Sequence, residues 1–198
     1  GVGNLGIVDD DKIELSNLSR QVLFTKKDIG KFKVSVSKKF IKKISKKINI
    51  KTFAKKIDRK NIHRIAKNYD IICDGTDNFK SRFLINDYCM KNKKILVSSA
   101  INKFDGQVFN FDFRRKTPCF RCFMPKSPNE EVNCESDGIM TTLAGIAGSL
   151  QANEVIKSIL NIGKNSHGNI MTFNALDSKF RKIKLLRNAN CKRNCIYA

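Results

Sequence analysis

The chain has 198 residues, of which 41% are hydrophobic and 29% are charged, a composition typical of a packed globular protein rather than a disordered one. No apolar run approaches the roughly 18 residues that a membrane span needs, and the first residues lack the features of a secretory signal, so we expect a cytoplasmic protein with no membrane partner. The net charge is +21, but 29 of the 39 basic residues are lysine; because RNA-reading surfaces favour the planar fork of arginine, we interpret the charge as compositional bias and expect no nucleic-acid partner.

The first half of the chain predicts strands that alternate with helices. Residues 4–9 are a short apolar run that ends in acid, as a strand would be. From Val34 to Ile48 apolar residues recur at helical spacing with lysines between them, which predicts an amphipathic helix. Further strands are predicted at 50–54, 69–73 and 95–99, and further helices at 61–68 and 77–91.

The second half predicts strands that follow one another. In residues 107–113, QVFNFDF, apolar and polar residues alternate from Phe109 onward, as in a half-exposed antiparallel strand. A long helix is predicted over 140–160, and strands at 169–173 and 182–186. The fold class is therefore α/β: a Rossmann-like mixed sheet, parallel early and antiparallel late, flanked by helices. We find no sign of a second domain and expect one domain over residues 1–198.

Three glycines at the start of the chain match a phosphate-loop pattern but lack its context. Gly1, Gly3 and Gly6 fit G-x-G-x-x-G, which works only after a strand and before a helix. Here a strand follows the pattern, so we reject a phosphate loop and rank a nicotinamide-dependent oxidoreductase low. The segment offers Asp9 instead, because an acid at the end of a strand can bind the hydroxyls of a ribose, although three acids in a row are also typical of a solvated turn.

The polar connection after this strand contains candidate phosphate ligands. Asn17, Arg20 and Gln21 lie within it, and Lys33 stands just before the predicted helix. Arginine and lysine can neutralise a polyphosphate, and asparagine can hold a phosphate or sugar oxygen. Basic residues occur throughout this chain, so Lys33 alone carries little weight.

Two carboxylates follow the buried strand predicted at 69–73. Ligands of open α/β sheets bind beyond the carboxyl ends of the strands, and there Asp74 and Asp77 could hold Mg²⁺ against phosphate oxygens. The alternative, given equal weight, is that Asp77 or Asn78 caps the next helix.

The seven cysteines are unevenly placed. Two close pairs, CFRC at 119–122 and CKRNC at 191–195, have the spacing of structural zinc ligands. The lack of a secretory signal argues against disulfides, and neither pair is predicted to open a helix after a strand as a redox CxxC does. We therefore predict a Zn²⁺ site formed by Cys119, Cys122, Cys191 and Cys195.

A further cysteine, Cys134, lies in an irregular stretch before the helix predicted near Met140. A thiol near a helix N-terminus has its thiolate favoured and can act as a nucleophile. A single cysteine in a loop is more often inert, so both interpretations stay open.

Five motifs occur in order along the chain: DDDKIELSNLSRQVLF, CDGTDN, PCFRC, NC-x-x-x-G at 133–138 and GSLQANEVIK. Together they resemble the family that adenylates ubiquitin-like sulfur carriers, the MoeB/ThiF/HesA type, which is related to ubiquitin-activating enzymes. The resemblance implies that ATP is bound through its ribose by Asp9 and through its phosphates by Asn17, Arg20 and Lys33, with Gln21 beside them. It implies further that Asp77 holds Mg²⁺, that the four paired cysteines hold Zn²⁺ with one extra residue in the last pair, and that Cys134 matches a loop thiol that takes up covalent chemistry in some members.

The resemblance also implies a reaction and its partners. The C-terminal carboxylate of a carrier ending in Gly-Gly attacks the α-phosphate of ATP, which gives an acyl-adenylate and pyrophosphate before a sulfur donor, acting in trans, supplies the thiocarboxylate. A homodimer is expected, and relative to the family the chain lacks the first strand, the Gly-rich loop and the first helix. The molybdenum-cofactor and thiazole branches both fit. The alternatives are an enzyme that activates a carboxylate on tRNA and a non-catalytic relative that binds a nucleotide or a partner.

Overall fold

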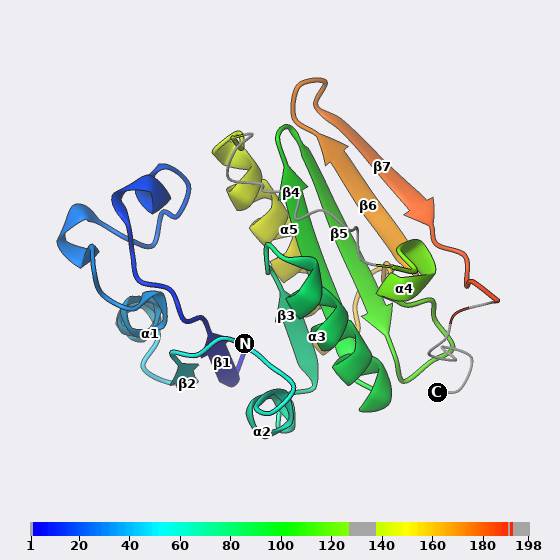
Figure 1. Ribbon diagram of the computed structural model, residues 1–198, viewed down its shortest axis with the longest axis horizontal. Coiled ribbons are helices and arrows are strands. Elements are labelled where there is room, and N and C mark those ends of the chain that lie inside the picture. Colours follow the sequence, from blue (N-terminus) through cyan, green and yellow to red (C-terminus); the bar gives the residue numbers. More distant parts are fainter. Residues whose placement is uncertain (1, 127–137, 190, 192–198) are drawn as a thin grey trace. The chain divides into compact units, whose positions relative to one another are not determined.

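The computed structural model describes residues 2–126, 138–189 and 191 (Figure 1). The chain divides into two compact units, unit 1 up to Asn61 and unit 2 from Ile62 onward.

Unit 1 is a β-α-β arrangement on two parallel strands. Strand β1 (Asn4–Val8) pairs in parallel with β2 (Asn49–Phe53). The helix α1 (Lys33–Ile44) connects them, preceded by two 3-10 turns, η1 (Leu15–Ser19) and η2 (Lys26–Asp28). The strand–helix–strand order predicted for this part of the chain is confirmed.

Helix α1 is shorter than its apolar pattern predicts. It ends at Ile44, and Ser45 has an extended backbone. The ammonium of Lys42 donates to the carbonyls of Lys46, at 3.0 Å, and Ile48, at 2.6 Å. These bonds satisfy carbonyls in the turn toward β2, so the chain can leave the helix before the last apolar residue of the pattern.

Unit 2 is built on a five-stranded sheet in the order β3-β4-β5-β6-β7 (Figure 1). Its elements are α2 (Ile62–Ala66), β3 (Ile71–Asp74), α3 (Phe79–Lys91), β4 (Ile95–Asn102), β5 (Asp105–Asp112), α4 (Phe120–Phe123), α5 (Thr142–Leu160), β6 (Asn169–Asn174) and β7 (Lys179–Lys184). Strands β3 and β4 are parallel, and the later pairs are antiparallel. The predicted change from parallel to antiparallel strands is confirmed, while β7 begins three residues earlier than predicted.

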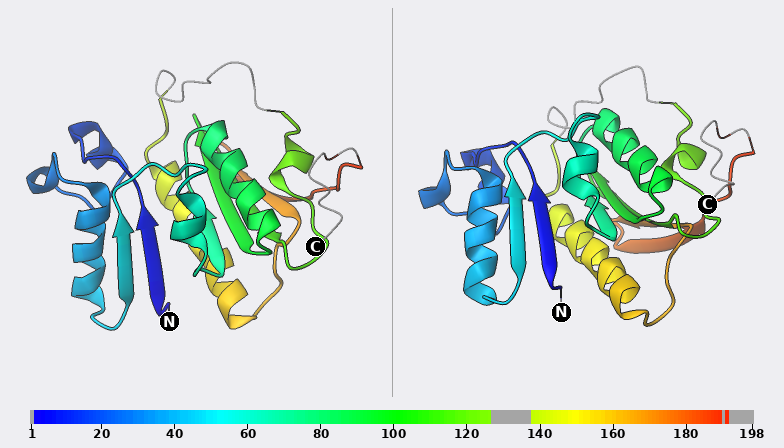
Figure 2. Two further views of the ribbon diagram at one scale, coloured as in Figure 1. Left: turned by 60° about the horizontal axis from the view of Figure 1, so that its bottom comes forward. Right: turned by 90° about the horizontal axis from the view of Figure 1, so that it is seen from below.

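Helices cover both faces of this sheet (Figure 2). On one face, α5 buries Leu143 and Ala147 against Phe173 of β6. On the other, Phe109 of β5 contacts Phe120 of α4 edge to face, at 5.5 Å between ring centroids. The central strands are therefore enclosed between two helical layers.

The enclosure corrects the prediction for β5, which is buried on both faces and not half-exposed. Its polar residues have internal partners: Asn110 donates to Glu154 of α5 at 2.8 Å, and Asp112 receives two bonds of 2.8 Å from the guanidinium of Arg114. Burial alone would raise the pKa of Asp112, but the bonds from Arg114 lower it overall. The polar residues of β5 therefore do not mark a face exposed to solvent. They are buried, because a polar residue that is hydrogen-bonded can occupy a position in the core.

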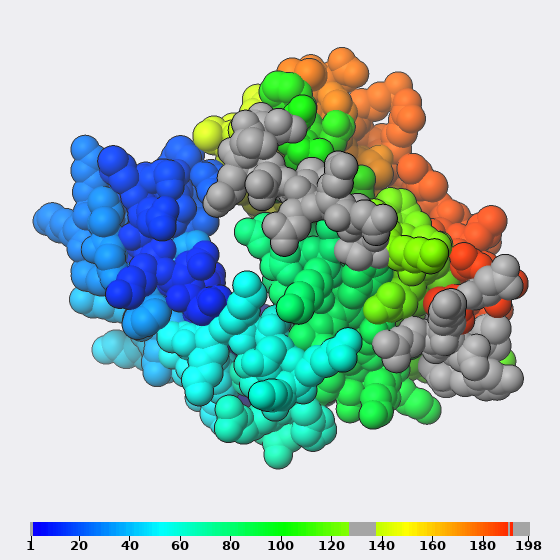
Figure 3. Space-filling view, viewed as in Figure 1, coloured from blue at the N-terminus to red at the C-terminus, as the bar shows by residue number. Residues whose placement is uncertain are grey.

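Strand β7 forms the exposed edge of the sheet (Figure 3). All six of its residues are exposed, and four of them are lysine or arginine. Charges on an edge strand discourage pairing with a second sheet.

None of the described helices combines the length and apolar character that crossing a membrane requires.

One glycine of the sheet has no room for a side chain. A Cβ at Gly106 would lie 1.9 Å from the ring of Phe173, which is itself buried against α5 and stacked on Phe180. We expect Gly106→Ala to lower the free energy of unfolding by about 1–3 kcal/mol, as overpacking does, and the melting temperature by about 2–12 °C.

Gly145 of α5 is the matched control, since a Cβ there meets no atom of the described residues within 4 Å beyond its own stretch of helix. Gly145→Ala should leave the melting temperature unchanged or raise it, because alanine is the better helix former. Thermal unfolding of the two variants checks both expectations, and equal melting temperatures would contradict the steric argument.

Candidate functional site

The acid predicted to bind ribose lies at the carboxyl end of β1 in unit 1. Asp9 follows the last residue of the strand, and its carboxylate accepts a hydrogen bond from the backbone N–H of Asp11 at 2.8 Å. The ammonium of Lys33, at the first position of α1, donates to the carboxylate of Asp11 at 2.6 Å. The structure therefore brings Asp9 and Lys33 together around one turn. Partial burial raises the pKa of Asp9, against the opposing effects of the Asp11 N–H and Lys33.

The other residues predicted near the phosphates surround the turn η1. The buried Asn17 accepts a hydrogen bond from the backbone N–H of Glu14 at 3.2 Å and so caps the turn. Arg20 and Gln21 follow it, each with its backbone N–H bonded to the carbonyl of Asn17. The side-chain oxygen of Gln21 is buried and has no hydrogen-bond partner among the described residues. Asn17 thus has a structural role in shaping the segment that carries Arg20 and Gln21.

In unit 2, the loop after β3 separates the two candidate carboxylates by burial. Asp74 is 1% exposed and accepts bonds from the backbone and hydroxyl of Thr76 and from the hydroxyl of Ser98. Its oxygens are engaged inside the protein, which argues against the magnesium role considered for it. Asp77 is exposed, and its carboxylate accepts a hydrogen bond from the side-chain amide of Asn78 at 3.2 Å. Asp77 is therefore the carboxylate of this loop that is available to a cation.

The alternative that Asp77 or Asn78 caps the next helix is decided in favour of Asn78. The side chain of Asn78 accepts the backbone N–H of Ser81 at 2.9 Å and caps α3. Asn78 supplies the oxygen that the first turn of the helix needs, so Asp77 is not required for that purpose.

Sequence reasoning missed two side chains that hold this edge of the sheet. Gln151 of α5 donates to the carbonyls of Asp74, at 3.0 Å, and Val97, at 2.7 Å, and so bridges the neighbouring strands β3 and β4. Arg82 of α3 is buried beneath the Asp77 loop. In the sequence Arg82 is one of several charged residues of this helix, and that pattern does not identify its partner.

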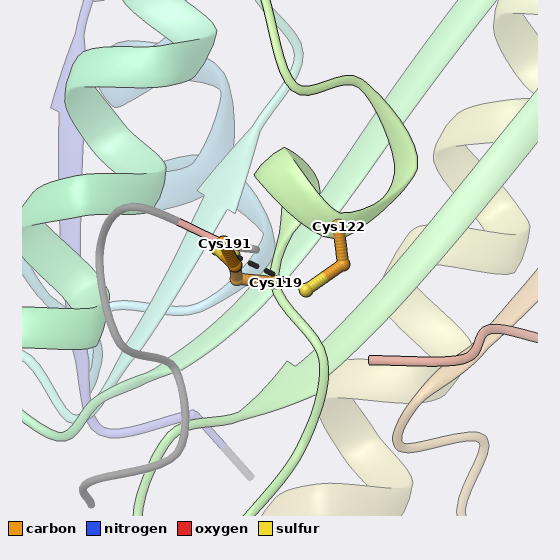
Figure 4. A group of neighbouring side chains, drawn as sticks. All are labelled: Cys119, Cys122 and Cys191. Atoms are coloured by element: carbon orange, nitrogen blue, oxygen red, sulfur yellow. Dashed lines mark hydrogen bonds between the residues drawn. The ribbon is translucent and has the colours of Figure 1, made fainter. Parts of the chain in front are cut away.

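Three of the four predicted zinc ligands form a cluster in unit 2 (Figure 4). The sulfur of Cys119 lies 3.9 Å from that of Cys122 and 3.7 Å from that of Cys191. Two sulfurs bound to one tetrahedral zinc at about 2.3 Å are about 3.8 Å apart. The spacing of these thiols therefore fits a zinc ion.

The local fold explains why the pair CFRC presents its sulfurs together. Cys119 is the N-cap of the one-turn helix α4, so Cys122 returns to the same side three residues later. This short helix corrects the expectation that no helix begins at the pair. The remaining predicted ligand, Cys195, and the predicted nucleophile, Cys134, lie outside the described residues.

The strand order and the two helical layers define the class of the protein: a mixed, Rossmann-like α/β fold that is parallel at its first strands and antiparallel at its last. The chain belongs to the ThiF family, whose model matches residues 1–195. The resemblance inferred from the five motifs is confirmed.

Curated relatives resemble nearly the whole chain. A probable molybdopterin-synthase adenylyltransferase of Gracilaria tenuistipitata var. liui is 39% identical over 191 residues, which cover 96% of this chain and 54% of the relative. A sulfur carrier protein adenylyltransferase of Thermus thermophilus is 36% identical over 197 residues, 96% of this chain and 73% of the relative. The chain thus spans about half the length of the first relative and about three quarters of the second.

Solved structures share the fold. E. coli MccB crystallised with AMPCPP and MccA superposes with a TM-score of 0.83 at 24% identity, covering 97% of this chain and 59% of MccB. MccB crystallised with ATP gives a TM-score of 0.82 at 23% identity, covering 96% and 58% of the two chains. At this identity the likeness establishes the fold alone.

Proposed function

We propose that this protein adenylates the C-terminal glycine of a ubiquitin-like sulfur-carrier protein, using ATP and Mg²⁺ and releasing pyrophosphate. The observation that carries the proposal is in the loop after β3. The Asp77 side chain is exposed and available to a cation, whereas the carboxylate oxygens of Asp74 are hydrogen-bonded within the fold. Family membership and the names of the adenylyltransferase relatives support the reaction class.

The chemistry demands positioning and neutralisation of charge. The attacking carboxylate is already ionised at neutral pH, so the reaction needs no general base. In the proposal Asp9 binds the ribose and Arg20 and Lys33 neutralise the phosphates, with Asn17, which also caps η1, and Gln21 beside them. Such groups act by holding the reactants in place and stabilising the developing charge.

Mg²⁺, held by Asp77 in the proposal, would supply positive charge at the phosphate oxygens. Carboxylate oxygen is the donor type that Mg²⁺ prefers, and the exposed Asp77 side chain fits that requirement. The basic residues Arg20 and Lys33 would add to the same neutralisation.

The cysteine cluster takes a structural role in this proposal. Zn²⁺ bound by Cys119, Cys122 and Cys191, with Cys195 as fourth ligand, would tie the α4 turn to the C-terminal segment. The thiol spacing supports that assignment. Cys134 would act after adenylation, in the transfer of sulfur from a donor protein acting in trans.

We propose that residues 1–198 work as one adenylating domain and that the protein is a homodimer. A molybdopterin-synthase carrier and a thiazole-pathway carrier are both candidates for the substrate. A relative from Haloferax volcanii, 33% identical over 193 residues, is named a SAMP-activating enzyme E1, and it adds a third kind of carrier to the candidates.

ATP–pyrophosphate exchange by the full-length protein tests the proposed function. We expect exchange with a carrier ending in Gly-Gly and background exchange with the same carrier lacking its last two residues. A parallel assay with tRNA tests the alternative that the enzyme activates a carboxylate on tRNA, and with it our interpretation of the +21 charge as compositional bias. Exchange that depends on tRNA and not on the carrier would overturn the proposal, and no exchange with either would indicate a non-catalytic relative.

A further inference from the structure

One buried arginine holds the loop that carries Asp77 from the inside. The side chain of Arg82 is 8% exposed, and its Nη2 donates to the carbonyl of Thr76 at 2.5 Å and to that of Ser99 at 3.2 Å. Thr76 directly precedes Asp77, and Ser99 belongs to β4. The guanidinium therefore ties the backbone next to Asp77 to a strand of the sheet.

The charge of Arg82 is balanced within the same loop. Its Nε lies 3.9 Å from a carboxylate oxygen of Asp74, which is itself fully buried. Asp74 also accepts the hydroxyls of Thr76 and Ser98, each at 2.7 Å. A buried charge is tolerated when it is paired and hydrogen-bonded, so these partners explain how an arginine can occupy this position.

An aromatic ring limits the movement of the guanidinium. The Arg82 group lies over the ring of Phe120, 5.7 Å from its centroid. Phe120 is held against α3 by its backbone N–H, which donates to the side-chain oxygen of Asn86 at 2.9 Å. Lysine cannot reproduce the whole arrangement, because its ammonium lacks the flat face that lies over Phe120 and a second nitrogen to face Asp74 while the first bonds the two carbonyls.

We propose that Arg82 is a positioning residue for adenylation: it holds the backbone at Thr76 so that the Asp77 carboxylate stays in place for the magnesium ion. The inference rests on the proposed function and deepens it, since it assigns the support of the cation ligand to a residue beyond the segment CDGTDN that contains Asp77. Arg82 acts through the loop, because its own side chain is buried beneath it.

Arg82→Lys in the full-length protein tests the inference by two measurements, the amide hydrogen exchange of residues 74–78 and the Mg²⁺ dependence of ATP–pyrophosphate exchange. We expect hydrogen exchange at least about tenfold faster, a higher half-saturating Mg²⁺ concentration, and a pyrophosphate-exchange rate about 10- to 100-fold lower, since small misplacements of a catalytic group have effects of this size.

Arg114→Lys is the matched control, because Arg114 also pairs with a buried aspartate, Asp112. Asp112 lies opposite the first residue of β4, Ile95, which is four residues along that strand from Ser99. We expect this variant to change neither the hydrogen exchange of the loop nor the Mg²⁺ dependence.

Ser98→Ala gives a second, milder variant should Arg82→Lys fail to fold, because it removes only one bond to Asp74. It should shift both measurements in the same direction by a smaller factor. Unchanged hydrogen exchange of the loop, or faster hydrogen exchange with unchanged Mg²⁺ dependence, would overturn the inference. If the unsubstituted protein shows no pyrophosphate exchange, the proposed function fails and the adenylation role of Arg82 fails with it, while loop hydrogen exchange still reports whether Arg82 holds the backbone.

Discussion

Asp77→Asn is expected to lower carrier-dependent ATP–pyrophosphate exchange by about 100- to 1000-fold, the usual effect of removing a group that stabilises charge in a transition state. The change keeps the size of the side chain and an oxygen that can accept from Asn78, but removes the negative charge that attracts Mg²⁺. Asp77 is exposed and does not cap α3, so the melting temperature should not change. Initial rates across a range of Mg²⁺ concentrations measure the effect.

Asp177→Asn controls for the loss of one acidic charge. Asp177 is exposed in the turn between β6 and β7 of the same unit, and its substitution should leave the exchange rate intact. Cys134→Ala should also spare the exchange, because sulfur transfer follows adenylation. A folded Asp77→Asn variant that retains most of its activity would exclude Asp77 as the magnesium ligand.

The elements predicted best are those that depend on residues close together in the sequence. The cap at Asn78 and the strand beginning at Ile95 were predictable because an N-cap side chain and an apolar run have local causes. The end of α1 was not, since it depends on where the ammonium of Lys42 finds carbonyls. The burial of β5 was missed for a similar reason, because its buried Asn110 has its partner, Glu154, 44 positions away along the chain.

The same distinction explains what was predicted of the candidate site. The spacing of the two cysteine pairs predicts that their sulfurs lie close together, and Cys119, Cys122 and Cys191 do lie together. Asp74 and Asp77 look equivalent in sequence, and only the tertiary bonds from Ser98 reveal that Asp74 is structural. The partner carbonyls of Arg82 lie 6 and 17 positions away, which no local pattern records.

Cys119→Ser is expected to remove zinc and destabilise unit 2. Metal analysis should find about one zinc per chain in the unsubstituted protein and little in the variant, because Cys119 is fully buried and its sulfur lies within 3.9 Å of both other thiols. When free zinc exceeds its dissociation constant a thousandfold, binding stabilises the fold by about 4 kcal/mol. For a chain of this size the melting temperature should fall by about 8–16 °C.

Cys89→Ser separates the loss of metal from the loss of a buried thiol. Cys89 of α3 is as fully buried as Cys119 but is not part of the cluster, and burial raises the pKa of its thiol well above the ordinary value. Serine at either position buries a hydroxyl in place of a thiol, so both variants lose some stability. Only Cys119→Ser should lose zinc. A chelator should then lower the melting temperature of Cys89→Ser and leave that of Cys119→Ser unchanged. Equal zinc contents in the two variants would contradict the assignment of Cys119 as a ligand, because the same chemical change would then have the same result inside and outside the cluster.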